Sequence, residues 1–407
     1  MLRIAPFAAI RPLPNQAARV ASVPYDVVSS AEARRLAEGN PISFLHVVKP
    51  EIDLPEGTGL YDDAVYAKAA ENFKRMQDDG VLVREPEPCI YLYKQTMGDH
   101  SQIGLVAVCH VDDYRDDIIR KHEKTRPVKE DDRTRLVDAL SANTGPIFLT
   151  YREDAAIDSL VDAITTGEAP VCDFVADDGI GHVLWRVPDG GGLVEAFGGV
   201  PLAYVADGHH RSASAFRVAS ERREANPDHD GSEDYNWFLC VLFPANQLKI
   251  LAYNRAVKDL AGMAPAEFLE TLASEFELAE AEEKVPPVPG EVRMYLSGTW
   301  YRLTWGKDAG ADPVSALDVS VLQDRLLEPV LGIADPRTDD RIAFVGGIRG
   351  SEELERLVDS GKAAVAFAVY PVSVEELMAI ADAGQIMAPK CTWFEPKLRS
   401  GLFVHTF

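Results

Sequence analysis

One segment near the middle of the chain constrains the fold most. Residues 201–206 (PLAYVA) are apolar and stop at Asp207-Gly208, as a buried strand stops at a turn. Ala213, Phe216 and Ala219 then recur at helical spacing, which predicts a helix over 211–223. A strand, a glycine turn and a helix in this order form one unit of a mixed α/β (α+β) fold. Strands and helices alternate along the rest of the chain, so we predict this class for the whole protein.

The turn itself collects polar and ionisable side chains. The first N–H groups of a helix lack partners inside the helix and attract anions, and glycine lets a ligand approach the backbone closely. An arginine adds a forked donor that matches phosphate. We predict that the phosphates of a nucleotide bind to Gly208, His209, His210, Arg211 and Ser212. Asp207 and His210 are candidate catalytic residues, and Asp207 is the candidate metal ligand. The alternative is a solvated turn, because glycine turns before helices are common.

A second candidate segment is basic although the protein is acidic. Four of the seven residues from 120 to 126 (RKHEKTR) are cationic, whereas the whole chain has a formal net charge of −24. Cations at this density suit a polyphosphate, so we predict that Arg120, Lys124 and Arg126 contact the nucleotide. We expect the cationic neighbours of Glu123 to keep it ionised, which makes it a candidate general base or metal ligand. The alternative is a solvated charged face.

Two further segments are candidates for binding the substrate. Tyr25 and Asp26 follow a short β-like stretch, and the Asp26 carboxylate is suited to an ammonium group or Mg²⁺. Lys390, Thr392 and Lys397 belong to an irregular basic and aromatic segment, 387–397 (MAPKCTWFEPK), and are candidates to line the entrance over the ligand. The alternatives are that Asp26 only begins a turn and that the later segment is an ordered surface loop.

Two glycine-containing loops carry weaker signals. Residues 143–146 (NTGP) precede a predicted strand; a place near the nucleotide is conceivable, but a plain turn is favoured. Residues 346–350 (GGIRG) form a second strand–glycine–helix turn with an arginine. This turn lacks the full Gly-x-Gly-x-x-Gly spacing, so it is weak evidence for dinucleotide binding.

The composition excludes several classes of partner. Asp plus Glu number 65 and Lys plus Arg number 41, and so acidic a surface repels nucleic acid and anionic membranes. No apolar run approaches the roughly 20 residues that cross a bilayer, and the N-terminal stretch does not read as a signal peptide. The chain has 5 cysteines without a C-x-x-C pair, which predicts free buried thiols and a cytoplasmic location.

Other patterns predict elements and domains. Residues 90–96 and 103–111 read as strands joined by a hairpin turn at 97–99, residues 248–257 as one strand, and residues 314–331 as one long helix. The polar stretch 224–235 (EANPDHDGSEDY) suggests a boundary. We predict a nucleotide-binding catalytic region over 1–235 and a further α/β region over 236–407, whose contribution to the site stays open.

The turn also resembles a known pattern. Asp207-Gly208-His209-His210-Arg211 matches in full the Asp-Gly-His-His-Arg of free L-serine kinases, which belong to the ParB/sulfiredoxin superfamily. Sulfiredoxins carry Gly-Gly-Cys-His-Arg there, so His209 replaces their cysteine, which argues against sulfinic-acid repair. Nearly the whole chain resembles the bacterial family of domain of unknown function 1015, through segments 24–28 (PYDVV), 121–125 (KHEKT), 253–255 (YNR) and 389–394 (PKCTWF). Cys391 stands where that family's pattern has Ser, which puts a hydroxyl role at this position in doubt.

These resemblances imply a ParB/sulfiredoxin-like nucleotide-binding core and an ATP-dependent kinase acting on free serine. The cofactors would be ATP (or ADP) and Mg²⁺, and the partners a nucleotide and a small amino acid, without nucleic acid or membrane; a homodimer stays open. One alternative is a nucleotide-gated binding module of ParB type without turnover. Another is a metal-dependent phosphohydrolase using Asp207, His209 and His210, although adjacent histidines at a helix start point in different directions.

Overall fold

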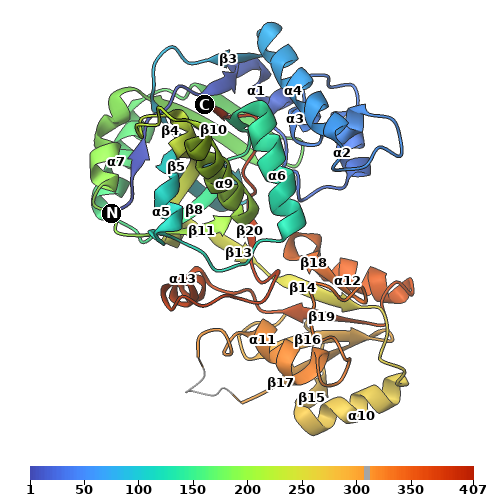
Figure 1. Ribbon diagram of the computed structural model, residues 1–407. Helices are drawn as coiled ribbons and strands as arrows, with labels where there is room; N and C mark the ends of the chain where they lie inside the picture. The colour runs from blue at the N-terminus through green and yellow to red at the C-terminus, as the bar shows by residue number, and fades with distance from the viewer. Residues whose placement is uncertain (307–311) are drawn as a thin grey trace. The chain divides into compact units, whose positions relative to one another are not determined.

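The computed structural model describes residues 1–306 and 312–407 and divides the chain into two compact units. Unit 1 comprises Met1–Lys121, Thr125–Leu248 and Pro396–Phe407; unit 2 comprises His122–Lys124 and Lys249–Glu395. Both units combine sheets with helices, so the predicted mixed α/β class, with an additional C-terminal α/β region, is confirmed (Figure 1). The predicted boundary at residue 235 precedes strand β12 (Trp237–Pro244), which pairs within the main sheet of unit 1.

Unit 1 is built on a nine-stranded sheet of mixed direction. Strand β11 runs parallel to β6 and antiparallel to β8, while β12 runs parallel to β8 and antiparallel to β5. In spatial order the strands are β6 (Ile119–Arg120), β11 (Ala203–Asp207), β8 (Ile147–Tyr151), β12, β5 (His100–His110), β4 (Ile90–Met97), β10 (Gly181–Val187) and β9 (Cys172–Val175), with β1 (Ile4–Ala5) paired to β5.

The central strands of this sheet are buried on both faces, as near-continuous apolar runs require. Residues 238–244 of β12 are all buried. One core gathers apolar residues of the strands and of four helices, which therefore cover one face: α5 (Val111–Arg115), α7 (Ala155–Gly167), α8 (Leu193–Phe197) and α9 (His209–Ala225).

The remaining helices of unit 1 form a second core, around Phe44, Phe73 and Val404. Helix α6 packs beside α9 and α4 (Figure 1). These elements are α1 (Ala17–Val20), α2 (Ser30–Ala37), α3 (Leu45–Val48), α4 (Asp63–Asp78), α6 (Pro127–Leu140), and the strand pairs β2 (Ile10–Pro12) with β3 (Leu82–Arg84) and β7 (Ala142–Asn143) with β21 (His405–Thr406). Short 3-10 turns are η1 (Pro14–Gln16), η2 (Pro50–Asp53), η3 (Pro188–Gly192), η4 (Asp234–Asn236) and η5 (Ala245–Gln247).

Unit 2 has a six-stranded antiparallel sheet. Its order is β15 (Glu277–Glu280), β17 (Thr299–Thr304), β16 (Glu291–Leu296), β19 (Val365–Val369), β14 (Tyr253–Val257) and β18 (Ile342–Gly346), and β13 (Lys249–Leu251) pairs separately with β20 (Trp393–Glu395). One core includes residues of α10 (Pro265–Glu275), α11 (Asp318–Leu322), the π-helical turn η6 (Gln323–Leu327) and α13 (Val374–Asp382). A second core includes α12 (Gly350–Asp359), which follows the 3-10 turn η7 (Gly347–Arg349).

Some element predictions hold and two are wrong. The hairpin is confirmed, with Met97 opposite His100. The predicted long helix over 314–331 is broken: the Asp312 carboxylate accepts hydrogen bonds from the N–H groups of Val314 and Ser315 and stabilises a turn, and α11 passes into η6 within five residues. The predicted strand 248–257 is two strands, because the carbonyl of Ala252 accepts a 2.7 Å hydrogen bond from Gly347 N–H between them.

All five cysteines are buried and carry free thiols, as predicted. Among residues 1–306 and 312–407, no helix combines the length and apolar character that a bilayer crossing requires.

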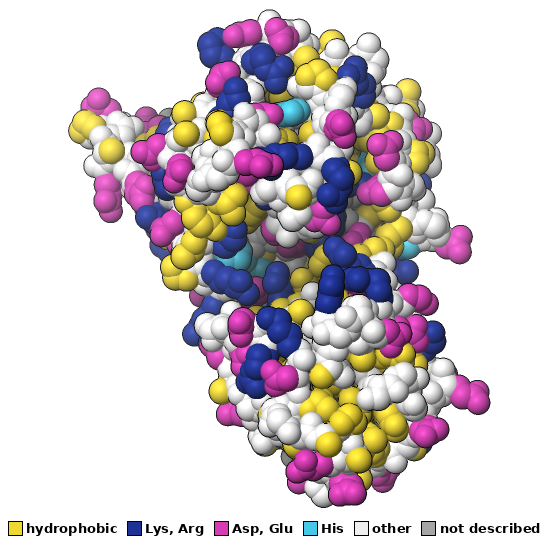
Figure 2. Space-filling view, turned by 90° about the vertical axis from the view of Figure 1, so that its right-hand side faces the viewer, with side chains coloured by type: hydrophobic (Ala, Val, Ile, Leu, Met, Phe, Trp, Pro, Cys, Tyr) yellow, Lys and Arg dark blue, Asp and Glu magenta, His cyan; other side chains and the backbone are white. Residues whose placement is uncertain are grey.

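Acidic and basic side chains are interspersed over the face drawn in Figure 2.

Candidate functional site

The site is built where β11 ends and α9 begins. The register between β11 and β8 shifts between Val205 and Asp207, and such a bulge re-aims the chain at the end of a strand. Gly208 has φ +101°, a left-handed conformation that suits glycine. Helix α9 begins at His209, two residues earlier than predicted, and its first turn contains no acidic residue. The positive end of the helix dipole is therefore not neutralised by the helix itself.

Arg211 folds back over this turn. Its Nε, Cζ and Nη2 atoms lie 3.0–3.1 Å from the position that a Cβ on Gly208 would take. Its Nη1 donates a hydrogen bond to the carbonyl of Pro146, in the loop before β8. Its Nη2 lies 3.6 Å from Oδ2 of Asp207. The guanidinium is thus held in one place, with a permanent positive charge beside the helix start.

Asp207 lies between two cations. Lys397 Nζ is 3.3 Å from the same oxygen that Arg211 approaches. Burial raises the pKa of Asp207, but the charges of Lys397 and Arg211 outweigh burial and hold that pKa well below its usual range. The carboxylate is therefore ionised at neutral pH.

The two histidines have different surroundings. His209 is buried, whereas His210 is half-buried and its Nε2 accepts a 3.0 Å hydrogen bond from Arg126 N–H. This bond places the ring proton of neutral His210 on Nδ1. It also brings the end of the basic segment to the turn, although the Arg126 side chain is exposed.

Ser212 has a structural role in this arrangement. It is fully buried, and both its N–H (2.9 Å) and its hydroxyl (3.1 Å) donate to the carbonyl of Gly208. The N–H groups of residues 209–211 precede this first bond of the helix, so they are the donors that a helix start presents to an anion.

Three other predicted residues belong to unit 1. Arg120 lies in β6, opposite Tyr204 of β11, so the basic segment leaves the sheet at the end where Asp207 lies. The ring of Tyr25 lies 3.9 Å from the Arg133 guanidinium, and burial raises the pKa of Tyr25. Tyr25 and Arg211 line one cavity, while Asp26 is exposed.

The other four predicted residues, Glu123, Lys124, Lys390 and Thr392, belong to unit 2. Within that unit, the N–H of Met387 donates to the carbonyl of His122 at 2.9 Å and joins segment 122–124 to the aromatic loop. Lys390 has φ +58°, and its Nζ lies 5.6 Å from the centre of the Tyr253 ring. Burial raises the pKa of the Cys391 thiol to about 11, so Cys391 is neutral at pH 7.

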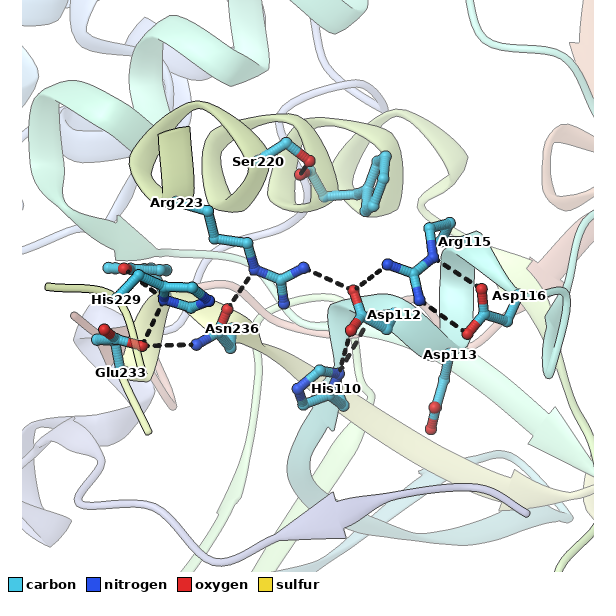
Figure 3. Close-up of polar contacts among 12 residues, drawn as sticks. His110, Asp112, Asp113, Arg115, Asp116, Ser220, Arg223, His229, Glu233 and Asn236 are labelled. Atoms are coloured by element: carbon cyan, nitrogen blue, oxygen red, sulfur yellow. Dashed lines mark hydrogen bonds and ion pairs between the residues drawn. The ribbon is translucent and has the colours of Figure 1, made fainter. Parts of the chain in front are cut away.

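The far end of α9 is fixed by a separate polar network (Figure 3). Arg223 donates to Asn236 (2.6 Å) and to Asp112 (2.7 Å), and Asp112 also pairs with Arg115 (3.1 Å). Burial raises the pKa of Asp112, but Arg223 and Arg115 outweigh burial and lower it. These groups satisfy one another, so the network anchors the helix whose first turn carries the site.

Asp207 is the carboxylate of the turn that could hold a metal ion. Within the described residues, no group of three or more His, Cys, Asp and Glu side chains is arranged to hold a metal ion. Lys397 donates its hydrogen bond to Oδ2 of Asp207, and the ion pair with Arg211 is also to Oδ2. One carboxylate oxygen plus phosphate oxygens is a common way to hold Mg²⁺.

Several contacts of the site were not predicted. The segment 387–397 makes Lys397 a candidate near the ligand, but its pairing with Asp207, 190 residues earlier, has no local signal in the sequence. Pro146 and Gly145 belong to the 143–146 loop, for which a plain turn was favoured; the structure brings this loop to Arg211. The sequence around Arg133 shows only a charged residue on a predicted helix and does not indicate a place in the site.

A family model described as protein of unknown function (DUF1015) matches residues 4–320. The chain belongs to this family. No curated protein matches the sequence of this DUF1015 member.

Solved structures similar to this DUF1015 chain include SbnI with a C-terminal truncation from Staphylococcus aureus, at 14% identity and a TM-score of 0.40, over 74% of this chain and 87% of that one. A free serine kinase in complex with AMP has 13% identity and a TM-score of 0.36, over 74% and 91%. A conserved hypothetical protein from Pyrococcus furiosus has 15% identity and a TM-score of 0.37, over 74% and 94%. At these values the likeness does not extend to an activity of this chain.

Proposed function

We propose that this protein is an ATP-dependent small-molecule kinase that phosphorylates the hydroxyl of free L-serine. The observation that carries the proposal is the turn from Asp207 to Arg211. A guanidinium is held over a left-handed glycine at a helix start that has no acid of its own. This arrangement suits the phosphates of a nucleotide. The full match of these five residues to the free serine kinase pattern supports the same substrate class.

In the proposed reaction the phosphates lie against residues 208–211, with Arg120, Lys124 and Arg126 adding positive charge. Asp207 would hold Mg²⁺, which neutralises charge on the phosphate oxygens. Glu123 takes the proton of the serine hydroxyl. The serine oxygen forms a bond to the γ-phosphorus, the bond from that phosphorus to the bridging oxygen breaks, and ADP leaves with the electron pair.

Proposed contacts with the amino acid come from Tyr25, Asp26, Lys390 and Thr392. Asp26 is exposed, as a carboxylate that meets an ammonium group must be before binding. His210 has its Nε2 engaged by Arg126 N–H, so we propose that it positions the turn rather than accepts the substrate proton.

The test is incubation of the full-length protein with Mg-ATP, or Mg-ADP, and a panel of free amino acids, followed by mass spectrometry for O-phosphoserine. The expected result is phosphoserine formed only with L-serine, and loss of the product in Glu123→Gln. Nucleotide binding without any phosphorylated product would contradict the kinase and favour the nucleotide-gated module. Phosphate release that no amino acid stimulates would favour the phosphohydrolase.

A further inference from the structure

A small cavity lies beside Arg211, entirely within unit 1. Its volume is about 30 Å³, which is room for roughly two water-sized atoms. Part of its lining is apolar. Its polar lining comes from Tyr25, Arg133, Asn143, Thr144, Arg211 and Ser400.

Three of these residues offer uncharged donors. The hydroxyls of Thr144 and Ser400 make no hydrogen bond with the described residues, although Thr144 is only 5% exposed and Ser400 also 5%. The Oδ1 of Asn143 already accepts from Leu239 N–H at 3.3 Å, which leaves the NH₂ of that amide for a ligand. Gly145 keeps the space open, because a Cβ there would lie 3.3 Å from Ser400 Oγ and 3.7 Å from Arg211 Nη1.

The two arginines add charged donors. Arg211 uses its Nε–Nη2 edge beside Gly208 and Asp207, whereas Nη1 reaches the loop that lines the cavity. Arg133 donates from Nε and Nη2 to Asp132, at 3.1 and 2.8 Å, so its Nη1 is the group left over. No Asp or Glu of the described chain lines the cavity.

A cavity lined by donors without an acid selects a group that only accepts hydrogen bonds. A carboxylate is such a group, and its two oxygens match the available volume, whereas a phosphoryl group carries at least three. We propose that this cavity binds the carboxylate of the acceptor, so that the substrates of the kinase are short amino or hydroxy acids with a free carboxylate. The claim that the bound group belongs to the phosphate acceptor rests on the proposed function. The claim that the cavity binds a carboxylate rests on the cavity alone.

The first experiment compares L-serine with L-serinamide and ethanolamine, which keep the hydroxyl and lose the carboxylate charge. The assay uses the full-length protein and Mg-ATP. We expect kcat/KM for L-serine to exceed that for either analogue by at least about 100-fold, because the analogue leaves the hydrogen-bond donors of the cavity without an acceptor. Equal rates with L-serinamide would overturn the inference and leave the kinase standing.

The second experiment uses Thr144→Val, which replaces a hydroxyl that lines the cavity with a methyl group of similar size. The expected result is a KM for L-serine raised about 10-fold, with kcat and the KM for ATP unchanged. Thr150→Val is the matched control, since Thr150 is also buried but its hydroxyl donates to the Phe243 carbonyl at 3.0 Å and does not line the cavity. A raised KM for ATP in Thr144→Val would assign the cavity to the nucleotide and overturn the inference.

If no acceptor is phosphorylated, the proposed function fails and the cavity is judged by binding. Ligand-observed NMR would then measure acetate and inorganic phosphate with wild type, Thr144→Val and Thr150→Val. Acetate bound by wild type and Thr150→Val but at least about 10-fold more weakly by Thr144→Val supports the carboxylate site. No acetate binding, or binding of phosphate in its place, overturns it.

Discussion

The protein contains two strand–glycine–helix turns with an arginine, and they are built in opposite ways. In unit 1, β11 passes through Gly208 into α9, and the cation Arg211 folds over the glycine. In unit 2, β18 passes through η7 and Gly350 (φ +71°) into α12, and a Cβ on Gly350 would collide with the carboxylate of Glu352. The first turn of α12 contains Glu352 and Glu353, whereas that of α9 contains no acid.

The difference teaches that the sign of the side chain beside the glycine decides what a helix start can bind. An acid in the first turn neutralises the helix dipole from within, so no external anion is needed. The glycines of the second turn serve packing: Gly347 N–H meets the Ala252 carbonyl at 2.7 Å, and a Cβ on Gly346 would lie 2.8 Å from the Trp393 ring. In the Gly208 turn the acid lies before the helix instead, where Asp207 is paired with Arg211 and Lys397, and α9 has no acid in its own first turn.

The largest expected effect is that of Arg211→Ala. Removing the guanidinium should lower kcat/KM about 10³-fold, or roughly 4 kcal/mol of transition-state stabilisation, because in the proposed reaction this charge lies against the phosphates. Steady-state kinetics with Mg-ATP measure it. Arg349→Ala, in the other turn, is the control and should leave kcat/KM unchanged; equal losses in the two variants would erase the distinction between the turns.

Gly208→Ala should weaken both stability and nucleotide binding. An alanine at φ +101° is strained, and its Cβ would lie 3.0 Å from Arg211 Nε. We expect a loss of about 1–2 kcal/mol in the free energy of unfolding and about 10-fold weaker ATP binding, measured by urea titration and calorimetry. Gly350→Ala should cost comparable stability without changing the Kd for ATP, and a weakened Kd there would show that the second turn also binds nucleotide.

His210→Glu places an acid in the first turn of α9, as Glu352 and Glu353 do in the first turn of α12. The new carboxylate can still accept from Arg126 N–H, and its charge should repel phosphate and interact with the helix dipole, so that ATP binds about 10-fold more weakly while unfolding changes by less than about 1 kcal/mol. His210→Gln keeps a neutral acceptor and is the control. Undiminished ATP binding in His210→Glu would argue against phosphate at this helix start.

The smallest expected effect is the pH-dependent contribution of Asp207 to the free energy of unfolding. Because Lys397 and Arg211 lower its pKa in the folded state, its contribution is present above the unfolded value of about 3.9 and is lost as the pH falls toward the folded value. Asp207→Asn should therefore be less stable than wild type by about 1–2 kcal/mol at pH 7, with a smaller gap at pH 3. Glu353→Gln, which breaks a more exposed pair with Arg356, should change stability by less than about 0.5 kcal/mol; urea titrations that show a constant gap for Asp207→Asn across pH would contradict the ion-pair account.

The turn was predictable from the sequence because its parts are local. An apolar run, a glycine and helical spacing lie within some twenty residues. The structure differs from the prediction by two extra residues at each end of α9 and by a strand over Ala203–Asp207 in place of 201–206. The ParB-type and kinase assignments, by contrast, rest on the residues of one turn.

What the sequence did not predict depends on distant segments. Asp207 meets Lys397 across 190 residues, and the 143–146 loop meets Arg211 through the pairing of β8 with β11. The helix predicted over 314–331 failed because side-chain capping by Asp312 and a π-helical turn override helical spacing.

The return of Pro396–Phe407 to unit 1 makes the candidate site depend on a segment that is synthesised after residues 249–395 of unit 2. Residues 1–121 and 125–248 of unit 1 are synthesised before Lys397 and before the strand that pairs with Asn143. A nascent or prematurely terminated polypeptide would therefore hold Asp207 without its ammonium partner. The proposed kinase activity is therefore expected only once synthesis has passed residues 249–395 and reached Lys397.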